Sequence, residues 1–295
     1  MGMAIEFDVA SVRKILRRRD LWKPTDHPYA VEQSVVPCDW SLHEKMGLRP
    51  GAKVLFFAGG AGNWADALAK GGVEVHYSDA SKPMVEHARK SFAGGGIKSF
   101  SRADAMAWPQ KQVRYDRFVS FEPIPLQSAS LPVAMLRAIA YSGGMTVAYG
   151  DVHAHKGEDL LNNVMRRFNS VYGAPVRVEE KRITAKPEGM GTAERMGGSA
   201  PVSFYHTDSP AEEKRRLARI DLGVLAAIGG RTDVSAAELA KKPTLAEFKL
   251  TEEDVLESLG RLAEISKAVN PILHNTVTVT TDGNYKRFAH WGVWK

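Results

Sequence analysis

Between Lys53 and Tyr149, short strand-like segments alternate with amphipathic ones, and this alternation restricts the possible folds more than any other feature of the sequence. The segments typical of buried strands are residues 54–57, 73–77, 97–100, 115–121 and 145–149. The segments typical of helices are residues 63–70, 82–92 and 131–140. Strands that alternate with helices at this spacing predict an α/β fold, in which helices cover both faces of a parallel sheet.

After Gly150 the alternation changes. Residues 159–172 have a helical pattern, and residues 176–184 and 202–206 are strand-like. A helix followed by an antiparallel pair would complete a doubly wound, mostly parallel seven-stranded sheet. We therefore expect an α/β domain over residues 36–210, preceded by a basic helical extension over residues 1–35.

Residues 211–295 have the pattern of a smaller, separate domain. Helical patterns cover residues 211–228 and 235–240, and a third begins at Thr251, where Asp254 follows at the spacing of a capping box. Two strand-like segments then meet at the turn Asp282-Gly283. Three helices followed by a hairpin is the order of a winged-helix domain, which we expect here.

The composition excludes several classes of protein. Of the 295 residues, 44% are apolar and 25% charged, as in globular proteins and unlike disordered or collagen-like chains. A single cysteine, Cys38, excludes an intrachain disulfide and a multi-cysteine zinc site. His153 and His155 lack a third ligand at a clear spacing, so we predict no metal site. No apolar stretch reaches about 18 residues and no signal segment is evident, so we expect a cytoplasmic protein without a membrane partner.

The segment Val54–Asn63 is a strand that runs into a glycine-rich turn and then a helix. Glycines let the backbone approach a ligand closely, and the helix N-terminus offers free amides to a negative group. Gly60, Gly62 and Ala65, with Asp79 about 20 residues further on, also fit the dinucleotide fingerprint of dehydrogenases. The loop alone therefore leaves two kinds of nucleotide cofactor open.

Residues 75–89 distinguish between these cofactors. Their sequence, Val-His-Tyr-Ser-Asp-Ala-Ser-Lys-Pro-Met-Val-Glu-His-Ala-Arg, closely resembles the second strand and helix of class I S-adenosylmethionine-dependent methyltransferases, and it argues against a dehydrogenase. The resemblance covers roughly residues 50–207 and implies S-adenosylmethionine as the cofactor. It implies that the glycine loop shapes the site of the methionine part, that Asp79 holds the ribose hydroxyls, and that Asp104 and Ala105 contact the adenine. The cofactor-binding residues that it implies are Ala58, Gly59, Gly60, Gly62, Asp79, Ala80, Asp104 and Ala105.

Two positions depart from the family pattern. Phe56 stands where the family has an acid in the first strand, and Ala58 replaces the first glycine of the loop. Both positions belong to the part of the site that holds the methionine amino end. A degenerate cofactor site is therefore an alternative to a functional one.

Glu122 follows the fourth predicted strand, whose end faces the methyl group in the family. Because the sulfonium already activates the methyl group, a base is needed only when the acceptor is a hydroxyl or a protonated amine. We take Glu122 as the candidate catalytic residue; the alternative is that it caps the start of a loop. The sequence Glu-Pro-Ile-Pro at residues 122–125 lacks the aromatic of the amine-methylating members, so the acceptor stays unidentified. Trp64, after the loop, is expected to pack in the core.

The net charge of +6 is spread along the chain without a basic tail, which is weak support for a nucleic acid partner. The third helix of the C-terminal domain, residues 251–269, carries two basic and five acidic side chains, a net −3. Groove insertion would bring these acids toward phosphates, so we favour a homodimer contact or a wall of the substrate pocket over duplex binding.

The sequence thus predicts S-adenosylmethionine-dependent methyl transfer to an unidentified acceptor, and it favours a homodimer contact or a substrate-pocket role for residues 211–295. The alternative is a non-catalytic regulator, in which a degenerate cofactor fold is joined to a nucleic-acid-binding winged helix.

Overall fold

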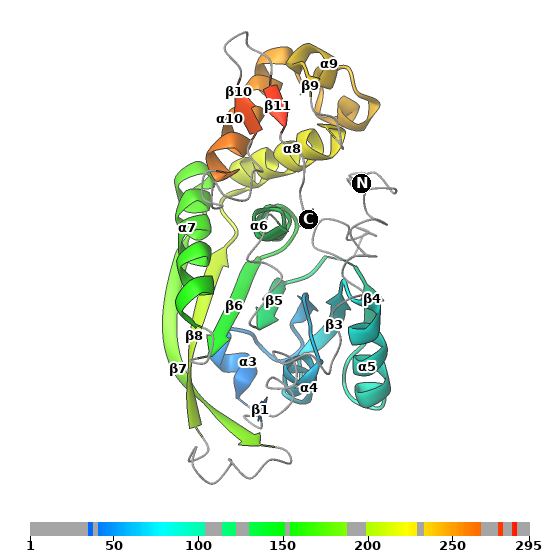
Figure 1. Cartoon of the computed structure of the whole chain (residues 1–295), viewed down its shortest axis with the longest axis vertical. Helices are drawn as coiled ribbons and strands as arrows, with labels where there is room; N and C mark the ends of the chain where they lie inside the picture. Colours follow the sequence, from blue (N-terminus) through cyan, green and yellow to red (C-terminus); the bar gives the residue numbers. More distant parts are fainter. Residues whose placement is uncertain are drawn as a thin grey trace.

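In the part of the chain that the computed structural model describes, one large sheet carries helices on both faces (Figure 1). The described residues are 35–37, 41–103, 114–121, 130–150, 154–187, 199–228, 233–266, 277–279 and 285–287. Among them, no helix is long and apolar enough to cross a membrane.

The large sheet is doubly wound and mostly parallel, as the sequence predicted. Its parallel strands are β2 (Lys53–Phe56), β3 (Glu74–Asp79), β4 (Ser99–Arg102), β5 (Arg117–Phe121) and β6 (Gly144–Gly150). The antiparallel additions are β8 (Ser199–Asp208), β7 (Val176–Pro187) and β1 (Val35–Pro37). The strand order is β1-β7-β8-β6-β5-β2-β3-β4, eight strands instead of the seven expected. The extra strand, β1, is three residues long and pairs with the end of β7 at the sheet edge.

Two helix layers cover the sheet. One face carries α3 (Leu42–Lys45), α4 (Asn63–Lys70) and α5 (Lys82–Phe92), and the other carries α6 (Ser130–Tyr141) and α7 (Ala154–Tyr172). Alternate residues of β2 enter opposite cores, because side chains on a strand alternate between its faces. Val54 and Phe56 pack on the α4 side, and Leu55 packs on the α6 side.

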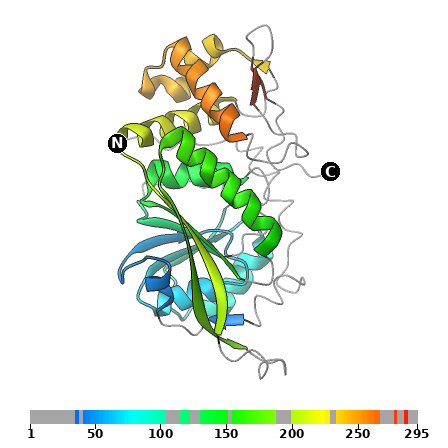
Figure 2. The same ribbon diagram turned by 90° about the vertical axis from the view of Figure 1, so that its left-hand side faces the viewer.

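The C-terminal elements lie together at one end of the molecule, next to α6 and α7 (Figure 1, Figure 2). They are α8 (Glu212–Ile228), β9 (Asp233–Val234), α9 (Ala236–Ala240), the 3-10 helix η3 (Pro243–Phe248), α10 (Glu252–Ser266), β10 (Val277–Val279) and β11 (Tyr285–Arg287). The two last strands form a hairpin, and β11 also pairs with β9. The capping box is confirmed: Asp254 N donates to Thr251 Oγ1 (3.1 Å) and Thr251 N to Asp254 Oδ2 (2.7 Å).

A buried ion pair joins α8 to both neighbouring helices. Asp221 of α8 is fully buried and accepts two hydrogen bonds from Arg261 of α10, at 2.9 and 2.8 Å. The Tyr172 hydroxyl of α7 donates to the same carboxylate at 2.5 Å. Burial raises the pKa of Asp221, and the hydrogen bonds from Arg261 oppose that rise. The hydrophobic core is continuous here as well, from the α6 face of the sheet to Leu259 of α10. The predicted domain boundary at residues 210 and 211 stays a prediction.

We expect Arg261→Met to lower the free energy of unfolding by about 3–5 kcal/mol, because it leaves the Asp221 carboxylate buried without its counter-ion. Urea denaturation of the whole chain measures the loss. Arg166→Met, an exposed position on α7, is the matched control and should change stability by less than about 0.5 kcal/mol. Equal losses of unfolding free energy in Arg261→Met and Arg166→Met would contradict a stabilising role of this ion pair.

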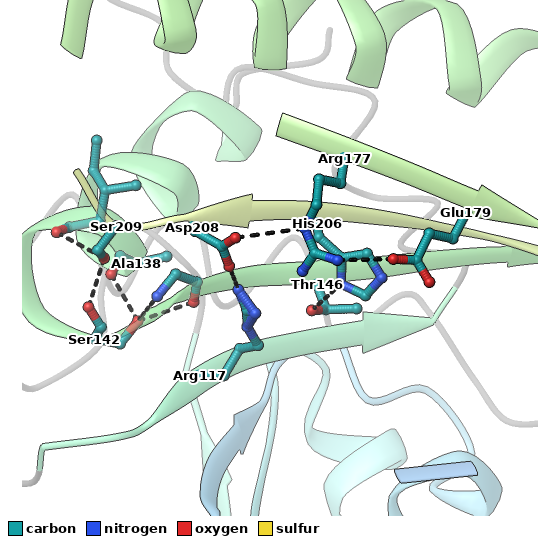
Figure 3. A network of polar contacts seen from close by, with 11 residues as sticks. Arg117, Ala138, Ser142, Thr146, Arg177, Glu179, His206, Asp208 and Ser209 are labelled. Carbon is teal, nitrogen blue, oxygen red and sulfur yellow. Dashed lines mark hydrogen bonds and ion pairs between the residues drawn. The ribbon is translucent and has the colours of Figure 1, made fainter. Parts of the chain in front are cut away.

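A second polar network lies at the amino ends of β5 and β6 (Figure 3). Arg117 forms an ion pair with Asp208, which also lies 3.7 Å from Arg177. Beside them, the Nδ1 atom of His206 lies 3.0 Å from the Thr146 hydroxyl, and the side chain is 1% exposed. Burial, with the neighbouring Arg117 and Arg177, lowers the pKa of His206 to about 4. His206 is therefore neutral in the folded protein at neutral pH.

This depressed pKa predicts a loss of stability in acid. Between pH 6.5 and about pH 4 the unfolded chain protonates this histidine and the folded chain does not, so stability falls as the pH falls through that window. The contribution is about 3 kcal/mol. His206→Gln should flatten the dependence of unfolding free energy on pH in this window, measured by urea denaturation at several pH values. An unchanged slope in His206→Gln would refute the assignment.

Candidate functional site

The chain reverses its winding direction between β2 and β5. From β2 it runs outward through β3 and β4 to one edge, and then returns to β5, which pairs with β2 on its other side. The helix after β2 covers one face and the helix after β5 covers the other. In open α/β sheets, ligands bind beyond the carboxyl ends of the strands at such a switch point. The residues after β2, β3 and β5 therefore define the candidate site.

The loop after β2 has an unusual backbone conformation, and the side chain of a buried tyrosine packs against it. Ala58, Gly60 and Gly62 all have positive φ angles, of 47°, 53° and 94°. A Cβ at Gly59 would lie 2.2 Å from the Tyr77 ring, so only glycine fits there. The Tyr77 hydroxyl donates to the Gly60 carbonyl at 2.7 Å. The loop is thus held in shape by the protein itself.

Asp79 connects this loop to the start of α5. Its Oδ2 atom accepts a hydrogen bond from Gly60 N at 3.0 Å, and its Oδ1 atom accepts one from Ser81 N at 2.8 Å. The side chain is half-buried, at the carboxyl end of β3. These two bonds orient the Asp79 carboxylate, whose oxygens act only as hydrogen-bond acceptors when the group is ionised.

The sequence motif after Asp79 begins a helix. Ser81 is the N-cap of α5, and its hydroxyl accepts from Met84 N at 3.4 Å. Pro83 lies in the first turn, where its missing N–H is not needed, and Met84 is fully buried. In contrast, the N-cap of α4 is Gly62, and no side chain caps that helix. The amides at its N-terminus can therefore meet a negative ligand group.

The two departures from the family pattern have different structural consequences. Phe56 is 1% exposed and packs in the core between the sheet and α4, so it offers no polar group to a ligand. Ala58 adopts a left-handed conformation that costs a residue with a Cβ about 1 kcal/mol. The loop therefore adopts this backbone conformation although the residue at position 58 is not glycine.

The structure brings together the predicted loop and strand-end residues Ala58, Gly59, Gly60, Gly62, Asp79 and Ala80. Asp104 and Ala105 directly follow Ala103, and Glu122 directly follows Phe121, but all three lie outside the described residues, as do Cys38 and His153. Among the residues described, no three His, Cys, Asp or Glu side chains gather as metal ligands would.

Sequence reasoning missed an aromatic pair at the switch point. Trp64, in the first turn of α4, stacks on Phe121 at the end of β5, with ring centroids 3.4 Å apart and planes 16° from parallel. Trp64 is 2% exposed, which confirms that it packs in the core, and Phe121 is partly exposed. The Nε1 atom of Trp64 is buried and has no acceptor within the described part of the chain. In the sequence, the only indication of this pair is that an aromatic residue stands next to each of the two predicted turns.

Several solved structures are similar to this chain at a low level. A magnesium protoporphyrin IX methyltransferase from Synechocystis PCC 6803, solved with bound S-adenosylmethionine, is 16% identical; the match covers 57% of this chain and 75% of that one, with a TM-score of 0.38. A TehB-like S-adenosylmethionine-dependent methyltransferase from Corynebacterium glutamicum is 16% identical over 57% and 87% of the two chains, with a TM-score of 0.35. We draw no functional conclusion from likeness at this level. No curated protein matches significantly.

A family model gives more direct information. The model described as a methyltransferase domain matches residues 54–141, which is less than half of the chain. This range begins in β2, includes the glycine loop and Asp79, and ends with α6. Residues 54–141 are thus similar to a methyltransferase domain, and they contain the β2–β5 part of the doubly wound sheet.

Proposed function

We propose that this protein is an enzyme that transfers a methyl group from S-adenosylmethionine to an acceptor not yet identified. The observation that supports it best is Asp79, a half-buried carboxylate oriented by Gly60 N and Ser81 N at the carboxyl end of β3. A carboxylate held in this way suits a pair of neighbouring hydroxyls, such as those of a ribose. The proposal includes a cytoplasmic location.

The described residues fit this cofactor. Asp79 would accept hydrogen bonds from the ribose hydroxyls, and Gly59, which has no Cβ, lets the loop backbone lie against the Tyr77 ring. When bound, S-adenosylmethionine supplies a methyl group already activated by a sulfonium. The work of the protein is then to align the acceptor with that methyl group and to exclude water. Asp104 and Ala105 complete the proposed site at the adenine.

We place Glu122 on the acceptor side, because it follows the last residue of β5 at the switch point. A carboxylate there can take a proton from a hydroxyl or an ammonium acceptor before transfer. It would not be needed for cofactor binding.

We expect calorimetry to give a dissociation constant in the micromolar range for S-adenosylmethionine and weaker binding of NAD. Asp79→Ala should weaken binding of S-adenosylmethionine by about 1–3 kcal/mol, because it leaves the ribose hydroxyls without their acceptor. Glu86→Ala, at an exposed position on α5, is the control and should leave the affinity unchanged.

Unchanged affinity in Asp79→Ala, or tighter binding of NAD, would overturn the cofactor assignment. The same titration of Glu122→Gln separates the two roles of that residue. Affinity like that of the wild type supports an acceptor-side role, and a loss as large as that of Asp79→Ala would place Glu122 in the cofactor pocket.

For the C-terminal part we propose a winged-helix arrangement that serves as a homodimer contact. The order α8, β9, α9, α10 and a hairpin paired with β9 supports this arrangement. A role in duplex binding is not favoured, because the exposed acids of α10 would face phosphates; they are Glu252, Glu253, Asp254 and Glu257. The alternative of a non-catalytic regulator draws its support from the buried Phe56.

Light scattering of the full chain should therefore give twice the chain mass of 32.4 kDa. Trp291 and Trp294, outside the described residues, are candidate contacts because aromatic side chains are enriched in interface cores. A monomer that binds duplex DNA at submicromolar concentration would favour the regulator instead.

A further inference from the structure

The Trp64–Phe121 pair spans the switch point. Trp64 belongs to the helix that follows the loop after β2, and Phe121 is the last residue of β5. The two rings are stacked, with centroids 3.4 Å apart, so the side chain of Phe121 is fixed by a buried neighbour. Phe121 itself stays partly exposed. A rigid, accessible aromatic ring therefore lies where the strand ends open toward a ligand.

Two carboxylates on β3 and α4, the elements next to the loop after β2, have partners within the protein. Asp79 accepts from the Gly60 and Ser81 amides, and the buried Asp66 pairs with Lys70 at 2.6 Å. At the end of β2, the apolar Phe56 turns into the core. The ring of Phe121 is a partly exposed group at the β2–β5 junction that can meet a cation through its π face.

Aromatic faces attract onium cations. The ring quadrupole places negative potential over the face, and the attraction is worth about 0.5–1 kcal/mol at exposed sites and about 2 kcal/mol or more when the cation is desolvated. A sulfonium is such a cation. After methyl transfer it becomes an uncharged thioether, and this attraction is lost.

We propose that Phe121, held in place by Trp64, contacts the sulfonium of S-adenosylmethionine and makes the site prefer this cofactor over its uncharged product, S-adenosylhomocysteine. This inference rests on the proposed function. In this proposal, the aromatic pair at the β2–β5 junction recognises the positive charge of the sulfonium. The preference would help the product to leave after each transfer.

Calorimetry of the full chain with both ligands tests the proposal. Phe121→Leu removes the π face but keeps an apolar side chain. It should weaken binding of S-adenosylmethionine by about 5- to 30-fold, the range that corresponds to 1–2 kcal/mol, and change the affinity for S-adenosylhomocysteine less than about twofold. Phe248→Leu, the same exchange in η3, is the matched control and should leave both affinities unchanged.

Two further variants separate the ring from other effects. Phe121→Tyr and Trp64→Phe keep aromatic rings in the stack, and Trp64→Phe removes the indole N–H; both should keep the wild-type ratio of the two affinities. Equal weakening of both ligands in Phe121→Leu would overturn the proposal. If Phe121→Leu does not fold, Phe121→Tyr provides the test. A folded Phe121→Tyr variant without the wild-type preference for S-adenosylmethionine over S-adenosylhomocysteine would also overturn the proposal. A wild-type protein that binds neither ligand would instead refute the proposed function.

Discussion

The carboxylate of Asp79 connects the two turns on which the candidate site depends. One oxygen accepts from Gly60 N in the loop after β2, and the other accepts from Ser81 N at the start of α5. Tyr77 supports the same loop, because its ring lies against Gly59 and its hydroxyl donates to the Gly60 carbonyl. Strand end, loop and helix start are therefore fixed before any ligand arrives, which lowers the entropy cost of binding.

The C-terminal helices pack against the helix layer on the α6 face of the sheet. Asp221, Arg261 and Tyr172 link α8 and α10 to α7, and the apolar core is continuous across this contact. A buried ion pair does not by itself add much stability, but breaking it by removing one partner is costly. Whatever the C-terminal part binds, we infer that it stays attached to the helix layer that covers the α6 face of the sheet.

The alternation of strands and helices was enough to predict the doubly wound sheet, because each strand is a short segment with its own turn signals. Local spacing also predicted the Thr251–Asp254 cap. In contrast, β1 is three residues long, too short for a periodic signal, and its pairing with β7 depends on the tertiary fold. The site could be predicted only where it followed a local motif, as at Asp79. The Tyr172–Asp221 bond joins positions 49 residues apart, and no local pattern predicts such a contact.

The most direct test of the candidate site is hydrogen–deuterium exchange of the full chain with and without S-adenosylhomocysteine. Because the ligand would cover the glycine loop and the start of α5, we expect slower amide exchange in residues 58–64 and 79–84 when it is bound. We expect no change in residues 206–208, which lie beside the amino ends of the parallel strands. Unchanged exchange in both strand-end segments, or slowing confined to residues 206–208, would show that the switch point between β2 and β5 is not the cofactor site.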